Sequence, residues 1–178
     1  MTIKVLEKTA GCFPQEFKEG DWIDLSLAED VNLKAPQANK MHIRNKNKKD
    51  TEEIRTRDVD FYSCIASLGV CMQIPKGYEA IVVPRSSTFR KYGIIQSNSF
   101  GVIDNSYCSD KDVWGMPMVA TRKVTIPKGT RVAQFRIQLS QKATAWQKIK
   151  WLFSSKVTLK QVSTLNNNER GGFGSTGN

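Results

Sequence analysis

One short segment combines an acidic side chain with an aromatic ring. Residues 101–107 are Gly-Val-Ile-Asp-Asn-Ser-Tyr, in which the apolar pair predicts the end of a buried strand and Asn-Ser predicts a turn. Asp104 therefore lies where the backbone can hold a carboxylate still, and Tyr107 follows in the same connection. A fixed carboxylate could act as a general base, and the ring could support a flat ligand.

A second segment has the composition of a phosphate-binding turn. Arg85 is followed by Ser86 and Ser87, and then by a short run compatible with a helix that ends at Gly93. A helix N-terminus offers free backbone N–H groups and the positive end of a dipole, and a guanidinium group binds phosphate oxygens well. The alternative is a connecting helix with a serine cap and no ligand, which the segment alone favours equally.

The chain ends in a glycine-rich segment. Residues 169–178 are Glu-Arg-Gly-Gly-Phe-Gly-Ser-Thr-Gly-Asn, and this composition alone predicts a flexible tail. The tail also contains Arg170, Phe173 and the pair Ser175-Thr176, which supply a charge, a stacking face and hydroxyl groups for a phosphorylated ligand. Such a tail could close over a site as a lid.

Two predicted strands carry further polar candidates. Alternation of apolar and polar residues over 22–27 predicts a strand whose polar face carries Asp24. Spacing alone favours an ordinary exposed acid at that position. Alternation over 131–139 predicts another strand, with Val132 and Gln134 on its outer face, where the glutamine could reach a ligand.

Length and composition restrict the class of protein. The chain has 178 residues, which suffices for one domain with a sizeable core. Its four cysteines lack the spacing of a metal site or a disulfide framework, and no apolar run reaches membrane-spanning length. The first residues lack the apolar region of a signal peptide. These features predict a cytoplasmic protein in a reducing setting that contacts no membrane.

Much of the positive charge is concentrated in one insertion. The chain carries 27 Lys and Arg against 17 Asp and Glu, a net charge of +10, which predicts attraction to polyanions such as nucleotides, nucleic acid or an acidic surface. In residues 39–57 a polar turn separates two arms, which predict a protruding hairpin with opposite charges paired across it. Nucleic acid is disfavoured as a partner because the ribbon lacks aromatic side chains for stacking. A protein partner at this hairpin stays open.

The rest of the chain predicts short strands joined by tight turns. The tetrapeptide Ile-Pro-Lys-Gly occurs at residues 74–77 and 126–129, and each copy predicts a hairpin turn. Residues 143–153 predict a short amphipathic helix whose Trp and Phe side chains pack on the body. Strands are expected at residues 2–6, 22–27, 61–66, 70–74, 78–83, 118–126, 131–139 and 157–162.

Five ordered motifs together resemble those of the trimeric dUTPase family. They span nearly the whole chain, at residues 20–25, 84–87, 101–107, 129–134 and 170–177. The resemblance implies an all-β, jelly-roll-like β barrel over residues 1–165, with one or two short helices and the basic β-hairpin inserted at about 37–58. It also implies a flexible glycine-rich lid at residues 166–178. The implied assembly is a homotrimer with sites shared between subunits, in which the tail of one subunit closes over a site built by the others.

The same resemblance implies an activity and a role for each candidate. The activity is hydrolysis of dUTP to dUMP and pyrophosphate, with Asp104 orienting and deprotonating the attacking water. Mg²⁺ would accompany the triphosphate, and Asp24 would reach the ion through water molecules. Asn98 and neighbouring backbone groups would recognise uracil, Tyr107 would pack under the deoxyribose and Phe173 would stack on the base. Four residues would bind phosphate oxygens: Arg85, Ser86, Gln134 and Arg170. The full implied substrate-binding set is Arg85, Ser86, Ser87, Asn98, Gly101, Val102, Ile103, Tyr107, Gln134, Arg170, Phe173, Gly174, Ser175 and Thr176.

The chain departs from the family pattern directly after Tyr107. The family usually continues with Arg-Gly or Gln-Gly, whereas residues 108–112 are Cys-Ser-Asp-Lys-Asp. The related enzyme dCTP deaminase shares the pattern Arg-Ser-Ser-x-x-Arg of residues 85–90, but it needs a glutamate after its third-motif loop, and residues 116–124 contain no acid. Two further alternatives are a dUTPase with an added regulatory role that grips a protein through the hairpin, and a nucleic-acid-binding module that rests only on net charge.

Overall fold

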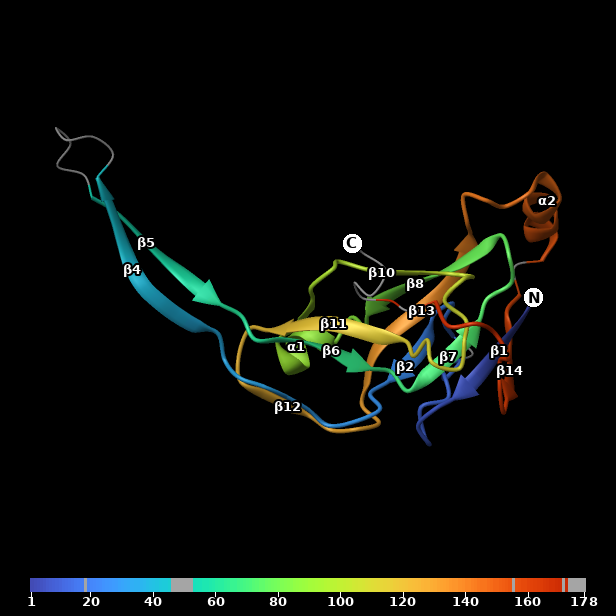
Figure 1. Ribbon diagram of the computed structural model, residues 1–178, viewed down its shortest axis with the longest axis horizontal. Helices are drawn as coiled ribbons and strands as arrows, with labels where there is room; N and C mark the ends of the chain where they lie inside the picture. Colours follow the sequence, from blue (N-terminus) through green and yellow to red (C-terminus); the bar gives the residue numbers. More distant parts are fainter. Residues whose placement is uncertain (18, 46–52, 155, 171, 173–178) are drawn as a thin grey trace.

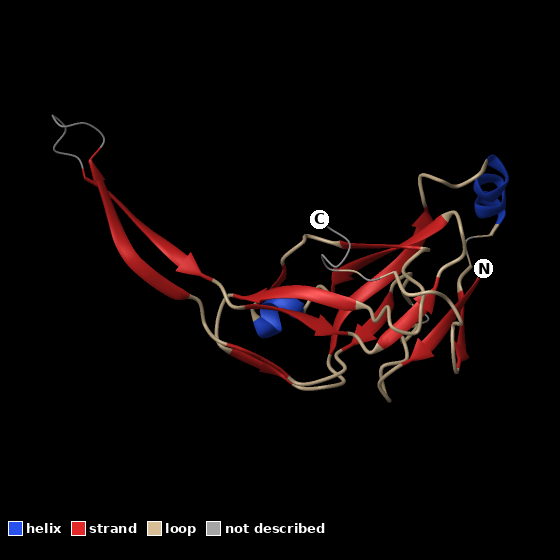
Figure 2. Cartoon of the chain, viewed as in Figure 1, coloured by secondary structure: helices blue, strands red, loops and turns tan. Residues whose placement is uncertain are grey.

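Strands dominate the computed structural model of the chain, which describes residues 1–17, 19–45, 53–154, 156–170 and 172 (Figure 1). The strands are β1 (Thr2–Glu7), β2 (Ile23–Ser26), β3 (Val31–Leu33), β4 (Gln37–Asn45), β5 (Glu53–Asp60), β6 (Ser63–Ser67), β7 (Val70–Gln73), β8 (Tyr78–Pro84), β9 (Ile94–Gln96), β10 (Gly101–Asp104), β11 (Gly115–Ala120), β12 (Val124–Ile126), β13 (Arg131–Leu139) and β14 (Thr158–Val162). The helices are α1 (Thr88–Tyr92) and α2 (Ala145–Phe153). The prediction of an all-β fold with one or two short helices is confirmed (Figure 2).

A four-stranded antiparallel sheet, with the strand order β10-β8-β13-β2, carries several of the predicted site residues, among them Asp24, Asp104 and Gln134. Its central strands pair from Ala133 opposite Pro84 to Leu139 opposite Tyr78. β10 lies at the edge of the sheet and pairs only with β8 among the described strands. The remaining sheets have the orders β14-β1-β7, β6-β11-β9, β12-β3 and β4-β5. Asp104 therefore lies on the edge strand of this sheet, while Gln134 lies on one of its central strands.

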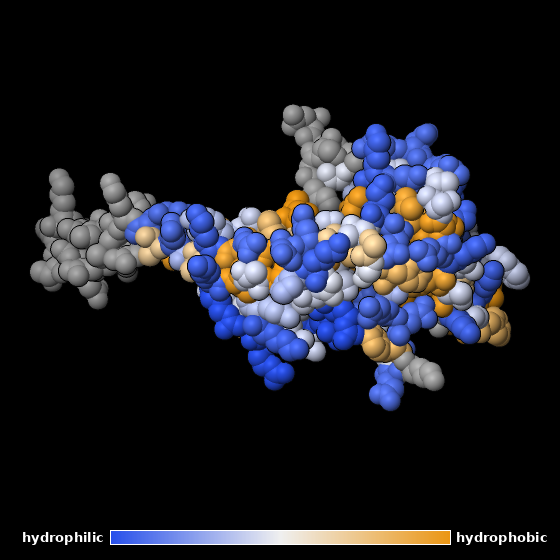
Figure 3. All heavy atoms as spheres, turned by 90° about the horizontal axis from the view of Figure 1, so that it is seen from below, coloured by the Kyte–Doolittle hydropathy of each residue, from blue (hydrophilic) through white to orange (hydrophobic). Residues whose placement is uncertain are grey.

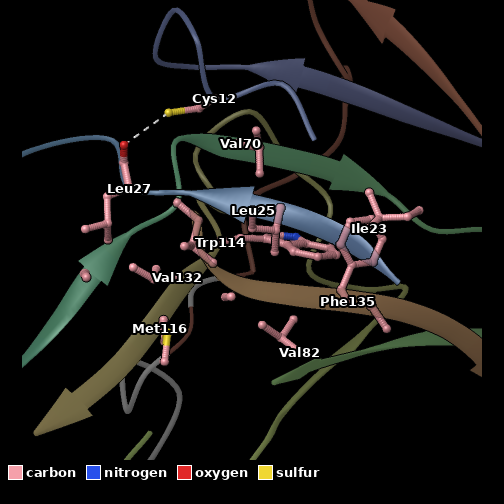
Figure 4. Close-up of a cluster of buried hydrophobic side chains, with 14 of the residues drawn as sticks. Cys12, Ile23, Leu25, Leu27, Val70, Val82, Trp114, Met116, Val132 and Phe135 are labelled. Carbon is pink, nitrogen blue, oxygen red and sulfur yellow. Dashed lines mark hydrogen bonds between the residues drawn. The ribbon is translucent and has the colours of Figure 1, made fainter. Parts of the chain in front are cut away.

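The hydrophobic core lies between these sheets (Figure 4). Trp114 and Phe135 are fully buried and meet edge to face, with ring centroids 5.2 Å apart. The Cys12 thiol donates to the backbone oxygen of Leu27 at 3.6 Å, the contact drawn as a dashed line in the close-up. Complete burial of a side chain such as that of Phe135 stabilises the fold by about 1.5–3 kcal/mol. All four residues of β2 are buried, so both faces of that strand are covered, including the face that carries Asp24.

Both Ile-Pro-Lys-Gly segments form tight turns, as predicted. Gly77 and Gly129 have φ angles of +83° and +77°, in the left-handed region that favours glycine. The N–H of Tyr78 donates to the backbone oxygen of Pro75, and the N–H of Thr130 donates to that of Pro127, each at 3.2 Å. The hairpin prediction is wrong, however, because each turn joins strands of two different sheets. The turns are corners between layers.

Two predicted strands also differ in detail from the observed ones. The strand expected over residues 118–126 is split into β11 and β12, since the N–H and hydroxyl of Thr121 bond the backbone oxygen of Gly93 at 2.8 and 2.9 Å and turn the chain there. Val132 was expected on the outer face of its strand but is fully buried. A register shift between Arg131 and Ala133 turns its side chain inward.

The predicted basic hairpin is confirmed as a two-stranded ribbon. β4 and β5 pair antiparallel from Gln37 opposite Asp60 to Asn45 opposite Glu53, and they project away from the body at one end of the molecule (Figure 1). The predicted pairing of opposite charges across the ribbon concerns side chains outside the described part of the chain. Hydrophilic residues cover much of the face drawn in Figure 3.

Helix α2 lies at the end of the molecule opposite the hairpin (Figure 1). The Thr144 and Gln147 side chains form a capping box that begins the helix. The prediction that its aromatic side chains pack on the body is wrong for Trp146 and Phe153, which are exposed, and holds for Trp151, whose ring lies 5.5 Å from that of Tyr78. In the described residues, no helix is long and apolar enough to cross a membrane.

Candidate active site

A cavity of about 300 Å³ opens beside β10 and brings together many of the predicted site residues. It is lined by Val82, Asn98, Gly101, Val102, Ile103, Asp104, Tyr107, Gly115, Arg170 and Gly172. Three strands and the start of the tail contribute to it. Val102, expected at the end of a buried strand, is exposed on this wall because β10 is an edge strand. Val82 and Gly115 were not predicted as site residues, because neither their residue types nor their spacing separates them from the other residues of their strands.

Local hydrogen bonds hold the Asp104 carboxylate at the end of β10. The predicted turn is confirmed: the N–H of Tyr107 donates to the Asp104 backbone oxygen at 3.2 Å, and the N–H of Ser106 donates to Asp104 Oδ1 at 2.7 Å. The Ser106 hydroxyl donates to the same oxygen. Arg170 Nη1 donates to the other oxygen, Oδ2, at 2.9 Å. Both oxygens are thereby oriented by the protein.

These contacts keep Asp104 ionised. Partial burial raises its pKa, but the hydrogen bonds from Ser106 and the charge of Arg170 outweigh burial, and the net pKa lies below the ordinary value. A carboxylate with a lowered pKa is fully available as a base near neutral pH. Its basicity is modest, so the geometry must place the water correctly.

Tyr107 forms a rigid wall next to Asp104. Its hydroxyl donates to the backbone oxygen of Val113 at 3.0 Å, and burial raises its pKa, so the hydroxyl stays protonated. Gly172 lies against the ring: a Cβ at that position would be 2.8 Å from Tyr107 Cε2. Only a glycine lets the tail backbone approach the tyrosine this closely.

A buried glutamine orients Asn98 at the opposite wall. Gln96 is buried, and its Nε2 donates to Asn98 Oδ1 at 2.9 Å and to the backbone oxygen of Val82 at 3.4 Å. Because Oδ1 of Asn98 is occupied, its Nδ2 group remains as a donor for a carbonyl oxygen of a ligand. Gln96 was missed from the sequence, and its polar side chain within an apolar strand is the signal that could have found it.

Asp24 belongs to a separate, charged cluster formed by residues of β2 and β13 and by the residue that follows β8. It is 4% exposed, and its two carboxylate oxygens accept from Arg85 Nε at 3.0 Å and from Arg131 Nη1 at 3.2 Å. The prediction of an ordinary exposed acid is therefore wrong. Neither of these two pairings was predicted from the sequence. Gln134 lies directly opposite Asp24 in the strand pairing.

The serines of the phosphate-binding turn lie beside this cluster. Ser86 is exposed and follows Arg85, whose N–H donates to the backbone oxygen of Val132 at 3.0 Å. Ser87 precedes α1 without a side-chain cap, against the prediction, while Gly93 ends the helix in the left-handed conformation as predicted. Among the described residues, neither this turn nor Asp24 and Gln134 lines the cavity of Asp104. One chain thus presents two separate groups of site residues.

In the described part of the chain, no group of three His, Cys, Asp or Glu side chains is arranged to hold a metal ion. Both oxygens of Asp24, which was expected to reach Mg²⁺ through water, are engaged by guanidinium groups. Resident Mg²⁺ held directly by these side chains does not fit this arrangement.

The loop that departs from the family pattern binds the beginning of the C-terminal tail. Asp110 accepts from the Thr164 hydroxyl and from the N–H of Leu165, both at 2.6 Å. Asn167 Nδ2 donates to the backbone oxygen of Cys108 at 3.0 Å. These contacts hold the beginning of the tail, and Arg170 and Gly172 beyond it line the cavity of their own chain. Phe173, Gly174, Ser175 and Thr176 lie outside the described residues.

Comparisons with known proteins agree on one family. The family model described as dUTPase matches residues 56–177. The chain is 40% identical, over 98% of its length and 96% of the relative, to the SPbeta prophage-derived deoxyuridine 5'-triphosphate nucleotidohydrolase YosS of Bacillus subtilis (strain 168). Its fold is similar to that of the dUTPase from Streptococcus mutans, with a TM-score of 0.59 at 19% identity over 82% of this chain and 100% of that one. A mutant dUTPase from phage phi11 of S. aureus, described as coordinating a structural Mg(II) ion, has a TM-score of 0.57 at 15% identity over 80% and 93% of the two chains.

Proposed function

The chain belongs to the dUTPase family, and on this premise we propose that it hydrolyses dUTP to dUMP and pyrophosphate. The observation that carries the proposal is the Asp104 carboxylate, oriented on the wall of a cavity that also holds Asn98 and Tyr107. This combination offers a base, a donor for a base edge and a flat apolar surface. Residues 1–165 form the catalytic body in this proposal, and residues 166–178 form its lid.

In the proposed reaction, Asp104 takes a proton from water as the water oxygen bonds to the α-phosphorus. The bond from the α-phosphorus to the bridging oxygen breaks at the same time, and pyrophosphate leaves with that oxygen. A positioned general base supplies a factor of roughly 10² to 10⁴ in rate. The Ser106 contacts leave the carboxylate one orientation and so restrict where the water can lie.

The cavity walls would select deoxyuridine. Asn98 Nδ2 would donate to a uracil oxygen, with the backbone of Gly101, Val102 and Ile103 completing the base contacts. The Tyr107 ring, fixed through Val113, would leave no room for a 2′-hydroxyl under the sugar. Polar groups matched to uracil stay unpaired against another base, and an unpaired group in a closed site costs binding free energy. Phe173 would stack on the base when the lid closes.

Phosphate binding would need a second copy of the chain. Arg85, Ser86, Ser87 and Gln134 would bind phosphate oxygens, yet these residues do not line the cavity of Asp104 in the same chain. A homotrimer in which one subunit supplies Asp104 and another supplies Arg85 would bring the two groups together. Arg170 and the residues that follow it, Gly174, Ser175 and Thr176 included, would complete the phosphate contacts.

Mg²⁺ enters this proposal as an ion carried on the triphosphate. When bound there, it would neutralise phosphate charge and hold the chain of phosphates in line. Asp24 would contact the waters of such an ion only if Arg85 or Arg131 turned toward the phosphates. A titration of dUTP hydrolysis with Mg²⁺ after treatment with EDTA tests the requirement.

Mixing two inactive variants tests the shared site. We expect Asp104→Asn and Arg85→Gln each to lose activity, and trimers formed from both to regain part of it, because some sites then combine two intact contributions. The measurement is dUTP hydrolysis after co-expression of differently tagged chains, with mixed trimers isolated by both tags. Each variant carried alone through the same isolation is the control. Mixed trimers without activity would show that every site lies within one chain.

A comparison of substrates tests the proposed selectivity. Pyrophosphate release should be much faster from dUTP than from dCTP, dTTP or UTP, because only dUTP fits both the base contacts and the sugar wall. Ammonia release from dCTP would instead identify a deaminase of the related type. Equal rates for UTP and dUTP would contradict the role of Tyr107.

The pKa of Asp104 gives an expectation for pH dependence. Because hydrogen bonds from Ser106 help to lower this pKa, Ser106→Ala should raise it, and the acid limb of the kcat/KM profile should move to higher pH. The profile of kcat/KM reports the free enzyme, in which these contacts exist. Ser154→Ala, a change at an exposed serine, is the matched control. An unmoved acid limb would mean that another group is the base.

A further inference from the structure

Helix α2 carries a row of large apolar side chains on its solvent-facing side. Trp146, Ile149, Leu152 and Phe153 are 74%, 45%, 83% and 86% exposed. Trp146, Ile149 and Phe153 recur at the i, i+3, i+7 spacing of a single helix face, and Leu152 borders it. None of the residues of α2 is buried. Exposed large apolar side chains that gather on one face mark a surface for interaction.

Contacts on the other side of the helix fix this orientation. Gln147 Nε2 donates to the backbone oxygen of Lys76 at 2.7 Å, and Trp151, one turn further on, packs against Tyr78. The spacing of i and i+4 places these two side chains on the same face of the helix. The helix is thus attached by Gln147 and Trp151, and its most apolar face is held away from the body.

Lysines flank the apolar face on both sides. At about 100° per residue, Lys148 and Lys150 lie to either side of the row formed by Trp146, Ile149 and Phe153. Both are exposed, as are Lys142 and Lys156 beside the helix. Residues 113–168 contain ten Lys and Arg and no Asp or Glu. The helix and the segments directly before and after it, residues 142–160, thus carry five lysines and no acidic residue.

We propose that α2 binds the surface of an anionic phospholipid membrane, with its apolar face in the interfacial layer and its lysines at the headgroups. A short helix with Trp, Phe and Leu on one face and Lys at its borders has the pattern of an interfacial helix. Lysine stems can lie along the apolar layer while their ammonium groups contact lipid phosphates.

The charge distribution favours a membrane over the other occupants. A second copy of α2 would bring like-charged borders together, which costs free energy. A groove on a protein would contact the helix alone, whereas exposed lysines also precede and follow it, at Lys142 and Lys156. An extended anionic surface matches both the apolar face and the lysines on and beside the helix. The sequence-based expectation of no membrane contact considered only spanning segments, and a peripheral helix needs none.

Vesicle binding by the full-length protein tests the proposal. We expect co-sedimentation with vesicles of phosphatidylcholine containing phosphatidylglycerol to be about tenfold stronger, or more, than with phosphatidylcholine alone. The paired change Leu152→Ser and Phe153→Ser should weaken that binding by about tenfold or more. Lys148→Gln with Lys150→Gln should weaken it as well, and added salt should do the same.

Controls separate this surface from general attraction by a basic protein. Phe61→Ser removes an exposed aromatic side chain near the base of the hairpin, 54% exposed, and should leave vesicle binding unchanged. All of these variants should retain dUTP hydrolysis, so a loss of vesicle binding can be told apart from a loss of the proposed activity. Binding that survives Leu152→Ser with Phe153→Ser would overturn the proposal in favour of net charge. A changed oligomeric mass in that variant would overturn it in favour of a contact between copies, and absence of binding to anionic vesicles would leave an acidic protein as the occupant.

Discussion

Asp104→Asn should lower the rate of dUTP hydrolysis by roughly 10² to 10⁴-fold, the usual contribution of a positioned general base. Asparagine has nearly the same shape, and it can still accept from the N–H of Ser106, but its amide cannot take a proton from water. Nucleotide binding should persist, because the walls formed by Asn98 and Tyr107 are unchanged. The measurement pairs turnover with calorimetric binding of a non-hydrolysable dUTP analogue.

The fold should tolerate this change. The ion pair between Asp104 and Arg170 is partly exposed, and such pairs contribute about 0–1 kcal/mol to stability. Asp30→Asn is the matched control, since that exposed carboxylate accepts from the N–H of Lys128 and does not line the cavity. Equal losses of activity in both variants, or substantial turnover in Asp104→Asn, would place the base elsewhere.

The part of the site that could be predicted from sequence is the part set by local chemistry. Asp104 and Ser106 are two residues apart, and an acid followed by a serine in a turn forms its hydrogen bonds within the segment itself. The left-handed glycines at Gly77 and Gly129 are likewise a local requirement of their turns. Neither case depends on what the rest of the chain does.

Asp24 shows why the other part could not be predicted. Alternation along β2 indicates two faces but does not reveal that both are covered, so the acid was expected to be exposed. Its partners are 61 and 107 residues away in the chain. The burial of this carboxylate is acceptable because two guanidinium groups pair with it, and that pairing exists only once β2, β8 and β13 have met.

The sequence alone shows neither what the loop after Tyr107 contacts nor which face of α2 meets the body. Residues 108–112 depart from the family pattern, and their sequence does not indicate a role. In the structure Asp110 accepts from the Thr164 hydroxyl and from the N–H of Leu165, and so sets where the tail begins. The period of α2 predicted an amphipathic helix correctly. Periodicity cannot say which face meets the body, and here the contacts of Gln147 and Trp151 decide it.

Removal of residues 170–178 should lower the rate of dUTP hydrolysis by roughly 10²-fold or more while leaving the fold and the oligomer intact. The truncated protein loses the Arg170 guanidinium, and a single lost charge-stabilising donor in an active site costs about 10² to 10³ in kcat. The cut lies beyond Thr164 and Leu165, so the contacts of Asp110 with the root of the tail remain. Turnover, thermal unfolding and mass in solution are the measurements.

The same truncation also makes a prediction about pH that a loss of folding would not produce. The charge of Arg170 helps to lower the pKa of Asp104, so its removal raises that pKa, and the acid limb of kcat/KM should move to higher pH. Arg170→Ala in the full-length chain should move the limb equally but lose less rate, because the remaining tail residues can still close. A fully active truncation would contradict the lid. A slow truncation with an unmoved acid limb would instead mean that the tail acts without contacting Asp104.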